Sequence, residues 1–354
     1  MCVADTAAGK PFHTPTAGAP PPRNPPLTRV TNHAAMAGMM IVRSLLCCTV
    51  LLFGSACGSA PSDGGNTVVP CPPRTPPTGA APGTNQLMPG ALRIRIATSS
   101  DGLRFDRAGV TVIDQAATPT LLTKAGFPPV VYYTAHKVDG MRDGAAMSIG
   151  SEDGKTWQHC SLNVSGLPAG AGVVDPDVVA RDDGTIRLYF TAPSAPGGPP
   201  AIHYADSRDG ANFTYGGVAY TRPAGTIDSA TVRIGSGWHM FALPLDTVAM
   251  LHASSSDGAS FTQIDQQERR IANEPHVLSQ GILDGQKVRI FGFNPMGQKI
   301  RSLLSSDGVA FSEEPTVHLA FDPTVSAEKS MIKDPAVSRR QSGLYVMAYA
   351  TAIP

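Results

Sequence analysis

Short apolar or alternating runs, bounded by turn residues, make up the chain from residue 91 onward. Clear examples are the runs 91–98, 129–134, 186–191, 238–242 and 288–292. Their length and their β-branched and aromatic content are typical of β-strands, and the glycines and aspartates around them favour tight turns. Buried helices would need longer runs and fewer turns. The pattern therefore predicts an all-β domain.

One phrase, Ser-x-Asp-Gly-x-x-aromatic, recurs five times in this region. Its successive aspartates are 48 to 56 residues apart, a spacing typical of a four-stranded β-propeller blade. Asp-Gly favours the positive φ of a tight hairpin, and the aromatic residue brings a large group to bury between blades. We interpret the aspartates as turn formers and not as catalysts. They are Asp101, Asp153, Asp209, Asp257 and Asp307.

The two ends of the domain complement each other. A single alternating strand precedes the first turn, whereas the last segment holds two strands and then stops. A ring closes if the C-terminal segment supplies the two inner strands of one blade and the N-terminal segment its two outer strands, which also hides the sheet edges. We therefore predict a five-bladed β-propeller over residues 87–354. Its expected blades are 117–160, 173–215, 226–263, 272–313, and 332–354 joined to 91–113.

A second phrase stands where each innermost strand should begin. Its first residue is acidic in four of the five blades, and proline follows it in four, as suits a strand start where a missing N–H costs little. These positions should face the axial funnel, so that the four carboxylates share one cavity. The five first positions are Thr118, Asp175, Asp228, Glu274 and Asp334. His276 follows two residues after Glu274 and would face the same side, or serve only as a hydrogen-bond partner.

Four carboxylates in one pocket repel one another. Repulsion raises the pKa of some and leaves others ionised, an asymmetry that acid/base hydrolysis of a glycosidic bond uses. The alternative is structural, because acids at strand starts also accept backbone N–H bonds and keep blades in register.

The Asp-Pro strand starts, the turn 182–184 and the Ser-x-Asp-Gly-x-x-Trp phrase resemble those of five-bladed propeller glycoside hydrolases of the arabinanase/xylosidase and invertase types. The resemblance covers residues 91–354. It implies Asp175 as base or nucleophile, Asp228 as modulator of a pKa and Glu274 as general acid. The family usually begins its acids on the first blade, where this chain has Thr118. We place Thr118, His276 and the extra acid Asp334 in substrate binding.

The sequence thus predicts a surface glycosidase-like protein that cleaves an extracellular glycan. The alternative is a non-catalytic carbohydrate-binding or scaffold propeller, which Thr118 and Ser229 favour. We expect a monomer without a cofactor or catalytic metal, although Asp334 could help to hold a structural cation in the axial channel. With 28 basic and 28 acidic residues, the chain has no net charge to attract nucleic acid.

The N-terminal region predicts export. We expect residues 1–38 to be disordered or to precede the true start codon. We interpret residues 39–57 as a lipoprotein signal peptide, since their apolar run is too short to span a bilayer. The residues before Cys57 resemble a bacterial lipobox, which implies lipidation of Cys57 and an anchor in the bacterial cell envelope. An ordinary signal peptide with secretion is the alternative. Residues 58–86 form a Pro/Gly-rich tether. Cys71 in this tether and Cys160 in the propeller either form a disulfide or remain unpaired.

Overall fold

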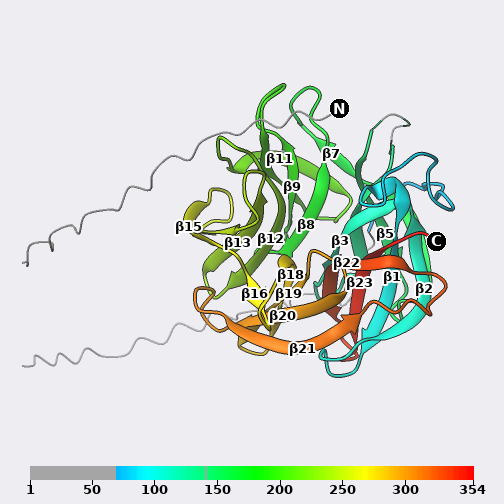
Figure 1. The fold of residues 1–354 in the computed structure, drawn as a ribbon. Coiled ribbons are helices and arrows are strands. Elements are labelled where there is room, and N and C mark those ends of the chain that lie inside the picture. Colours follow the sequence, from blue (N-terminus) through cyan, green and yellow to red (C-terminus); the bar gives the residue numbers. More distant parts are fainter. Residues whose placement is uncertain (1–68, 139, 141) are drawn as a thin grey trace, which may run out of the picture. The chain divides into compact units, whose positions relative to one another are not determined.

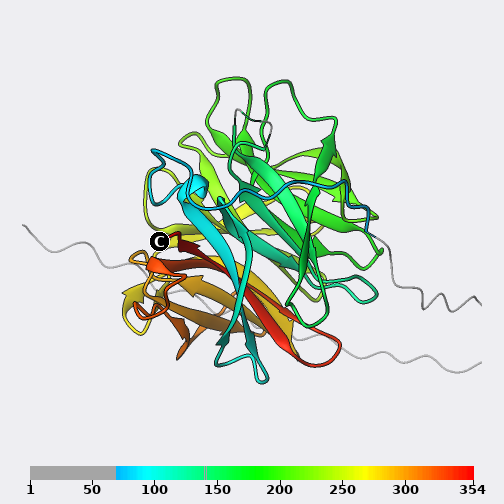
Figure 2. The same ribbon diagram turned by 90° about the vertical axis from the view of Figure 1, so that its right-hand side faces the viewer.

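Five mainly antiparallel sheets stand around one axis in the part of the chain that the structure describes, residues 69–138, 140 and 142–354 (Figures 1 and 2). The structure is a computed structural model. One short 3-10 helix, η1 (Pro89–Ala91), precedes the first strand. Within the described ranges, no helix has the length and apolar character needed to cross a membrane.

Each blade has four strands, and its innermost strand comes first in the following description. The first blade contains β3 (Ala116–Leu122), β4 (Val130–Ala135), β5 (Gly144–Gly150) and β6 (Trp157–Ser161). The second contains β8 (Val174–Ala180), β9 (Ile186–Pro193), β10 (Pro200–Ser207) and β11 (Asn212–Tyr220), with β7 (Asn163–Ser165) parallel to β11. The third contains β12 (Thr226–Ile234), β13 (Gly237–Pro244), β14 (Met250–Ser255) and β15 (Thr262–Gln267).

The fourth and fifth blades hold the two departures from simple repetition. The fourth contains β18 (Val277–Asp284), β19 (Lys287–Phe293), β20 (Lys299–Ser305) and β21 (Ser312–Ala320), and the small hairpin of β16 (Arg270–Ile271) and β17 (Glu274–Pro275) precedes it. The fifth contains β22 (Lys329–Arg339), β23 (Tyr345–Ala352), β1 (Leu92–Ser99) and β2 (Asp106–Asp114).

The fifth blade closes the ring. Strand β1 pairs with β23 along its whole length, from Leu92 opposite Ala352 to Ser99 opposite Tyr345, and the two strands lie side by side in cyan and red (Figure 2). The C-terminal strands are the inner pair and the N-terminal strands the outer pair. The predicted five-bladed propeller, with its last blade closed by both ends of the domain, is confirmed.

The repeated phrase forms the turn between the third and fourth strands of every blade. In each copy the Asp Oδ1 accepts a hydrogen bond from the backbone N–H two residues later, at 2.8 to 3.1 Å. The glycine that follows has φ between 69° and 79°, where a residue without Cβ is favoured. These aspartates therefore build turns, as predicted.

The aromatic residue of the phrase links neighbouring blades. In four copies it meets an aromatic ring on the second strand of the preceding blade edge to face, with ring centroids 5.3 to 6.3 Å apart. Such pairs contribute about 0.5–1.5 kcal/mol each beyond their buried area. The pairs are Tyr132 with Phe213, Tyr189 with Phe261, Phe241 with Phe311, and Phe291 with Phe105.

Part of the predicted tether lies on the first blade. The backbone N–H of Ser161 donates to the carbonyl of Pro72 at 2.9 Å, and that of Arg74 donates to His159 at 3.0 Å, so this segment covers the outer edge of β6. Cys71 and Cys160 form a disulfide with their Cα atoms 4.8 Å apart. The pairing that the sequence left open is therefore made, and it fixes the segment to the propeller.

Removing this disulfide by Cys71→Ser should lower the free energy of unfolding by about 2–4 kcal/mol, because the bond restricts a long loop in the unfolded chain. The two cysteines are 89 residues apart. Urea unfolding followed by tryptophan fluorescence would measure the change. Wild-type protein reduced with dithiothreitol should unfold like the variant, and a variant as stable as the oxidised wild type would contradict a stabilising role.

Candidate functional site

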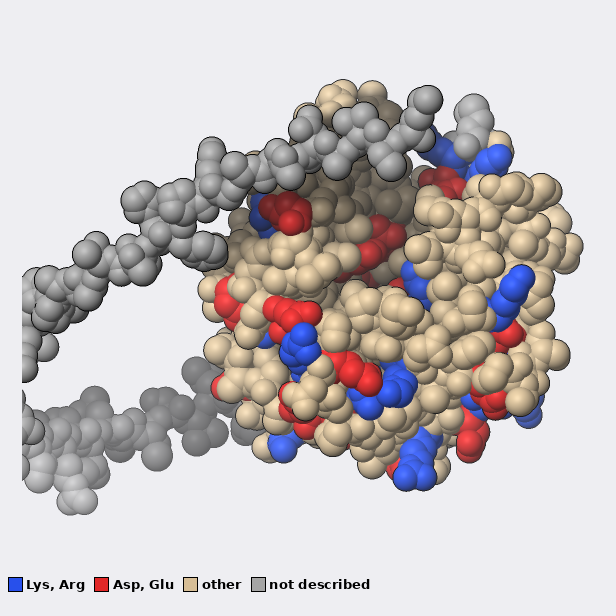
Figure 3. All heavy atoms as spheres, in the orientation of Figure 1, with Lys and Arg blue, Asp and Glu red and all other residues tan. Residues whose placement is uncertain are grey.

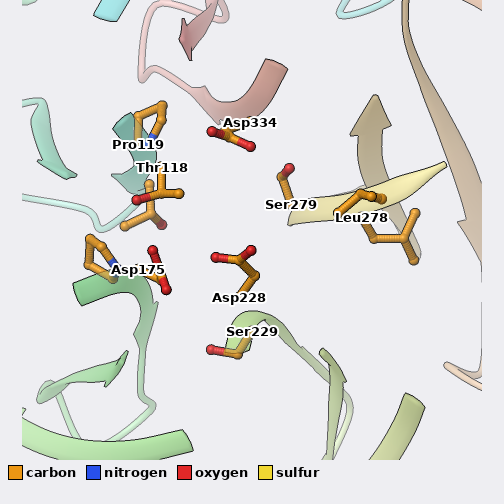
Figure 4. A pocket seen from close by; sticks show the side chains of 11 residues that line it. Thr118, Pro119, Asp175, Asp228, Ser229, Leu278, Ser279 and Asp334 are labelled. Atoms are coloured by element: carbon orange, nitrogen blue, oxygen red, sulfur yellow. The ribbon is translucent and has the colours of Figure 1, made fainter. Parts of the chain in front are cut away.

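The innermost strands share an unusual backbone feature close to their starts. Thr118, Asp175, Asp228 and Asp334 all have positive φ, between 46° and 53°, and each lies where the pairing with the next strand skips residues. A non-glycine residue in this conformation costs about 1–3 kcal/mol. A bulge of this kind re-aims a side chain, and here four blades use it to turn a side chain toward the axis (Figure 4).

These side chains line one pocket. It offers about 380 Å³ of space, including the part open to solvent, and acidic side chains are visible inside a central hollow of the molecule (Figure 3). All five innermost strands or their starts contribute to it. The lining residues are Thr118, Pro119, Thr120, Asp175, Pro176, Asp228, Ser229, Val277, Leu278, Ser279 and Asp334.

Asp175 and Asp228 face each other in the pocket (Figure 4). Burial raises the pKa of Asp175, opposed by a hydrogen bond from Thr191 and assisted by the charge of Asp334. Burial raises the pKa of Asp228 further, well above its usual range, and the charges of Asp175 and Asp334 add to the effect. Two neighbouring carboxyls hold one proton more easily than none, and Asp228, whose pKa is raised further, is the member that favours it.

Lys333 is the cationic partner of this cluster. Its Nζ lies 3.1 Å from Asp334 Oδ2. Burial lowers the pKa of Lys333, but the charges of Asp334 and Asp228 outweigh that effect and the net shift is upward. Asp334 is thus a buried acid beside an ammonium, whereas no Lys or Arg among the described residues forms an ion pair with Asp228.

The second strands of two blades support the bulges. Thr134 on β4 accepts a hydrogen bond from the backbone N–H of Asp175 at 2.8 Å, and its hydroxyl lies 2.9 Å from that of Thr118. Thr191 on β9 accepts from the backbone N–H of Asp228 at 3.3 Å. The same residue type thus satisfies the backbone donor of a bulge in consecutive blades.

A layer of polar contacts lies below the pocket. Gln280 on β18 accepts from the backbone N–H groups of Leu121 at 3.2 Å and Val337 at 3.1 Å, and donates to the Leu121 carbonyl at 2.8 Å. It therefore connects three innermost strands across the axis. Asp177 on β8 accepts from the N–H of Thr231 at 2.7 Å and joins two further strands. These contacts form the floor of the pocket.

The structure does not bring Glu274 into this pocket. Glu274 lies on β17, where Oε1 is 2.9 Å from Lys299 Nζ and Oε2 is 2.7 Å from Arg301 Nη1. Hydrogen bonding from Lys299 lowers its pKa, which keeps it ionised. The bulge of the fourth blade falls between Leu278 and Gln280, so Ser279 fills the place for which the sequence suggested Glu274 (Figure 4).

His276 also lies outside the pocket lining. Its ring is buried, and Nδ1 lies 2.9 Å from the carbonyl oxygen of Glu274. Burial lowers the pKa of His276, so its neutral form prevails. This geometry matches the hydrogen-bond alternative for His276. Lys333 and Ser279 are the pocket-related residues that the sequence interpretation missed.

Within the described ranges, no group of three or more His, Cys, Asp or Glu side chains is arranged to hold a metal ion. The positive charge beside the carboxylates comes instead from Lys333. Cys57, the predicted lipidation site, and the predicted signal peptide lie outside the described residues.

No protein-family model matches the chain, and no curated protein matches its sequence. Solved structures do match it. A candidate glycoside hydrolase from Bacteroides ovatus aligns with a TM-score of 0.52 and 13% identity over 67% of this chain and 86% of its own. A glycosyl hydrolase from the same species aligns with a TM-score of 0.50 and 13% identity over 79% of this chain and 97% of its own.

A candidate glycoside hydrolase from Parabacteroides distasonis gives a TM-score of 0.50 and 12% identity over 78% of this chain and 95% of its own. At such identities the likeness concerns the fold. It confirms that the chain shares the propeller fold of the glycoside hydrolases it was predicted to resemble.

Asp177→Asn should remove part of the pH dependence of stability. Burial raises the pKa of Asp177 to about 7 from an ordinary 3.8, so the folded protein binds this proton more tightly than the unfolded chain does. The contribution to stability is full below about pH 4 and is lost as the pH rises toward about 7, by a few kcal/mol at most. Urea unfolding at pH 4.5 and pH 7.5 would measure it.

In the Asp177→Asn variant, stability should therefore change less between these two pH values than in the wild type. The exposed carboxylate of Asp246, replaced in Asp246→Asn, is the matched control and should leave the wild-type dependence intact. An unchanged dependence in Asp177→Asn would show that Asp177 is ionised in the folded protein.

Proposed function

We propose that this propeller binds a glycan at the acidic pocket and hydrolyses a terminal glycosidic bond there. The observation that carries the proposal is the convergence of Asp175, Asp228 and Asp334 from three blades on one pocket, with Lys333 as their counter-charge. Their surroundings raise the pKa of Asp228 further than that of Asp175. Such a separation of acid and base is what glycoside hydrolysis requires.

The different pKa values of Asp175 and Asp228 suggest their roles. We assign Asp228 as the general acid that protonates the glycosidic oxygen, with the charge of Asp175 raising its pKa. Asp334, whose carboxyl group lies beside Lys333, is assigned to the opposite side as base or nucleophile. These roles revise those that the family resemblance implies for Asp175, Asp228 and Glu274.

The shape of the pocket indicates which part of a sugar chain enters it. Gln280 and Asp177 form its floor, so a sugar chain cannot thread along the axis past them. A terminal sugar residue fits this description better than an internal one. Thr118 and Ser279 supply hydroxyl groups for hydrogen bonds to its ring substituents.

Asp228→Asn should reduce kcat/KM on a cleaved aryl glycoside by about 10²–10⁴, the usual contribution of a positioned acid. In the wild type, activity should fall as the pH rises through the pKa of Asp228. A panel of aryl glycosides and plant or bacterial polysaccharides would identify the substrate first. Asp246→Asn, which changes an exposed carboxylate, is the matched control.

Glu274→Gln separates this assignment from the one that the resemblance implies. With Asp228 as the acid, Glu274→Gln should keep most of the activity, because Glu274 lies outside the pocket. If Glu274 were the acid, Glu274→Gln would lose activity by about 10²–10⁴. That outcome would overturn the role given to Asp228.

A non-catalytic, glycan-binding function is the second candidate. Glu274 is held in ion pairs away from the pocket, and Thr118 stands on the first blade where the related enzymes usually have an acid. A sugar that binds in calorimetry but from which the wild-type protein releases no product would decide for it.

We further propose that Cys57 is lipidated and anchors the protein in a bacterial cell envelope. Its support is the small-residue sequence before Cys57 after an apolar run. Cys57→Ala should abolish fatty-acid labelling and release the protein from the membrane fraction. Cys48→Ala, upstream of the predicted cleavage, should keep the label. Labelling that persists in Cys57→Ala would rule the assignment out.

A further inference from the structure

A second cavity system lies at the other end of the innermost strands. One cavity is lined by the later residues of β3, β8, β12 and β18, below the layer that Gln280 forms. It shares Thr123, Leu283 and Arg339 with an adjoining cavity of about 1080 Å³, including space open to solvent. Cationic side chains gather in that adjoining cavity, in contrast to the carboxylates of the acidic pocket. They are Lys124, Arg339 and Arg340.

Arg340 is the unusual member of this set. It is only 9% exposed, and neither Nε nor Nη2 has a hydrogen-bond partner among the described residues. Its backbone is satisfied, since the N–H donates to Leu344 at 2.8 Å and the carbonyl accepts from Gly343 at 2.9 Å. Burying a charged group without hydrogen bonds is costly. A guanidinium that lines a cavity in this state therefore has free donors, for which the described residues provide no acceptor.

The neighbouring side chains strengthen this reading. The Nζ of Lys124 lies 3.8 Å from the centroid of the Phe127 ring, which holds the ammonium at the same cavity. Burial lowers the pKa of Lys124, and burial lowers that of Arg340 to about 10. Both cations thus lack a full counter-charge. Glu152 is the acid that lines the cavity. Its charge raises the pKa of Arg340, but it does not remove the downward shift.

We propose that this cavity is an oxyanion-binding site in which Arg340 and Lys124 hold a carboxylate or phosphate group. The planar guanidinium offers parallel N–H donors that match two oxygens of such a group, and the ammonium adds a point charge. Phe127 and Leu122 line the same cavity and provide apolar surface for the body of a ligand. The anion is either a free inorganic ion or the acid group of a sugar. The site goes beyond the proposed hydrolysis and does not depend on it.

The test uses the full chain and two probes, sodium phosphate and sodium glucuronate, with sodium chloride at matched ionic strength as the reference. Calorimetry should show saturable binding of at least one probe. Arg340→Met should weaken that binding at least tenfold, because it removes the guanidinium and keeps an unbranched apolar stem. Arg104→Met is the control, since Arg104 is exposed and does not line the cavity.

Thermal unfolding distinguishes loss of a ligand from loss of the fold. Without added anions, Arg340→Met should melt at or above the wild-type temperature, because a buried charge without partners has been removed. The bound probe should raise the Tm of the wild type and of Arg104→Met, but not that of Arg340→Met. Binding of phosphate alone would assign the site to an inorganic ion, and binding of glucuronate alone would assign it to an acidic sugar.

Two outcomes would overturn the proposal. One is the absence of saturable binding of either probe to the wild type. The other is equal binding to the wild type and to Arg340→Met, which would mean that the effect arises from salt in general. Neither outcome bears on the acidic pocket, because glycoside cleavage is measured with different substrates and different variants.

Discussion

Everything in this molecule depends on the pairing of β1 with β23, which closes five sheets into a ring. Closure forces the five innermost strands to begin around one axis, although they are separated by up to about two hundred residues of sequence. A bulge at the start of four of these strands then turns a side chain toward that axis. The acidic pocket is a consequence of the ring: no single blade contains more than one of its three carboxylates.

The backbone conformations and the neighbouring carboxyls of the pocket cost folding free energy, which other interactions of the fold must offset. Four left-handed non-glycine residues carry a cost of about 1–3 kcal/mol each, and three carboxyls are brought together with one ammonium. The offset comes from the interblade aromatic pairs, the threonines behind the bulges and the closed edges. Functional sites commonly hold such strain because their geometry must be kept before the ligand arrives. The repulsion itself serves the chemistry, since it keeps a proton on Asp228 that an isolated aspartate would lose.

The fold could be predicted from the sequence because its signals are local and repeated. Asp-Gly turns at a regular period fix the number of blades, and the unequal strand counts at the two ends fix how the ring closes. Asp175, Asp228, Asp334 and Thr118 could also be placed, since each lies in an innermost strand and all but Asp228 stand directly before a proline. Glu274 could not be placed in the same way. A short hairpin, β16 with β17, precedes the fourth blade and takes up the Glu-Pro phrase, which leaves Ser279 at the bulge.

Lys333 could not be assigned to the pocket from the sequence for a related reason. Strict alternation assigns residue 333 to the face opposite Asp334, but the pairing skips between Lys333 and Ala336, and the long side chain reaches the carboxylate. Bulges are set by the partner strand and the neighbouring blades, so a sequence period of two does not reveal them.

The axis therefore has two chemically different ends. Carboxylates occupy the pocket at the strand starts, and arginine and lysine side chains occupy the cavity beyond the layer of Gln280. Because the whole chain carries no net charge, this separation is a property of the ring and not of the composition. The proposed oxyanion site would therefore attract an acidic ligand that the carboxylates of the acidic pocket repel. Gln280 lies between the two ends, because its side chain bonds to β3 and β22 across the axis and also lines the cavity beyond them.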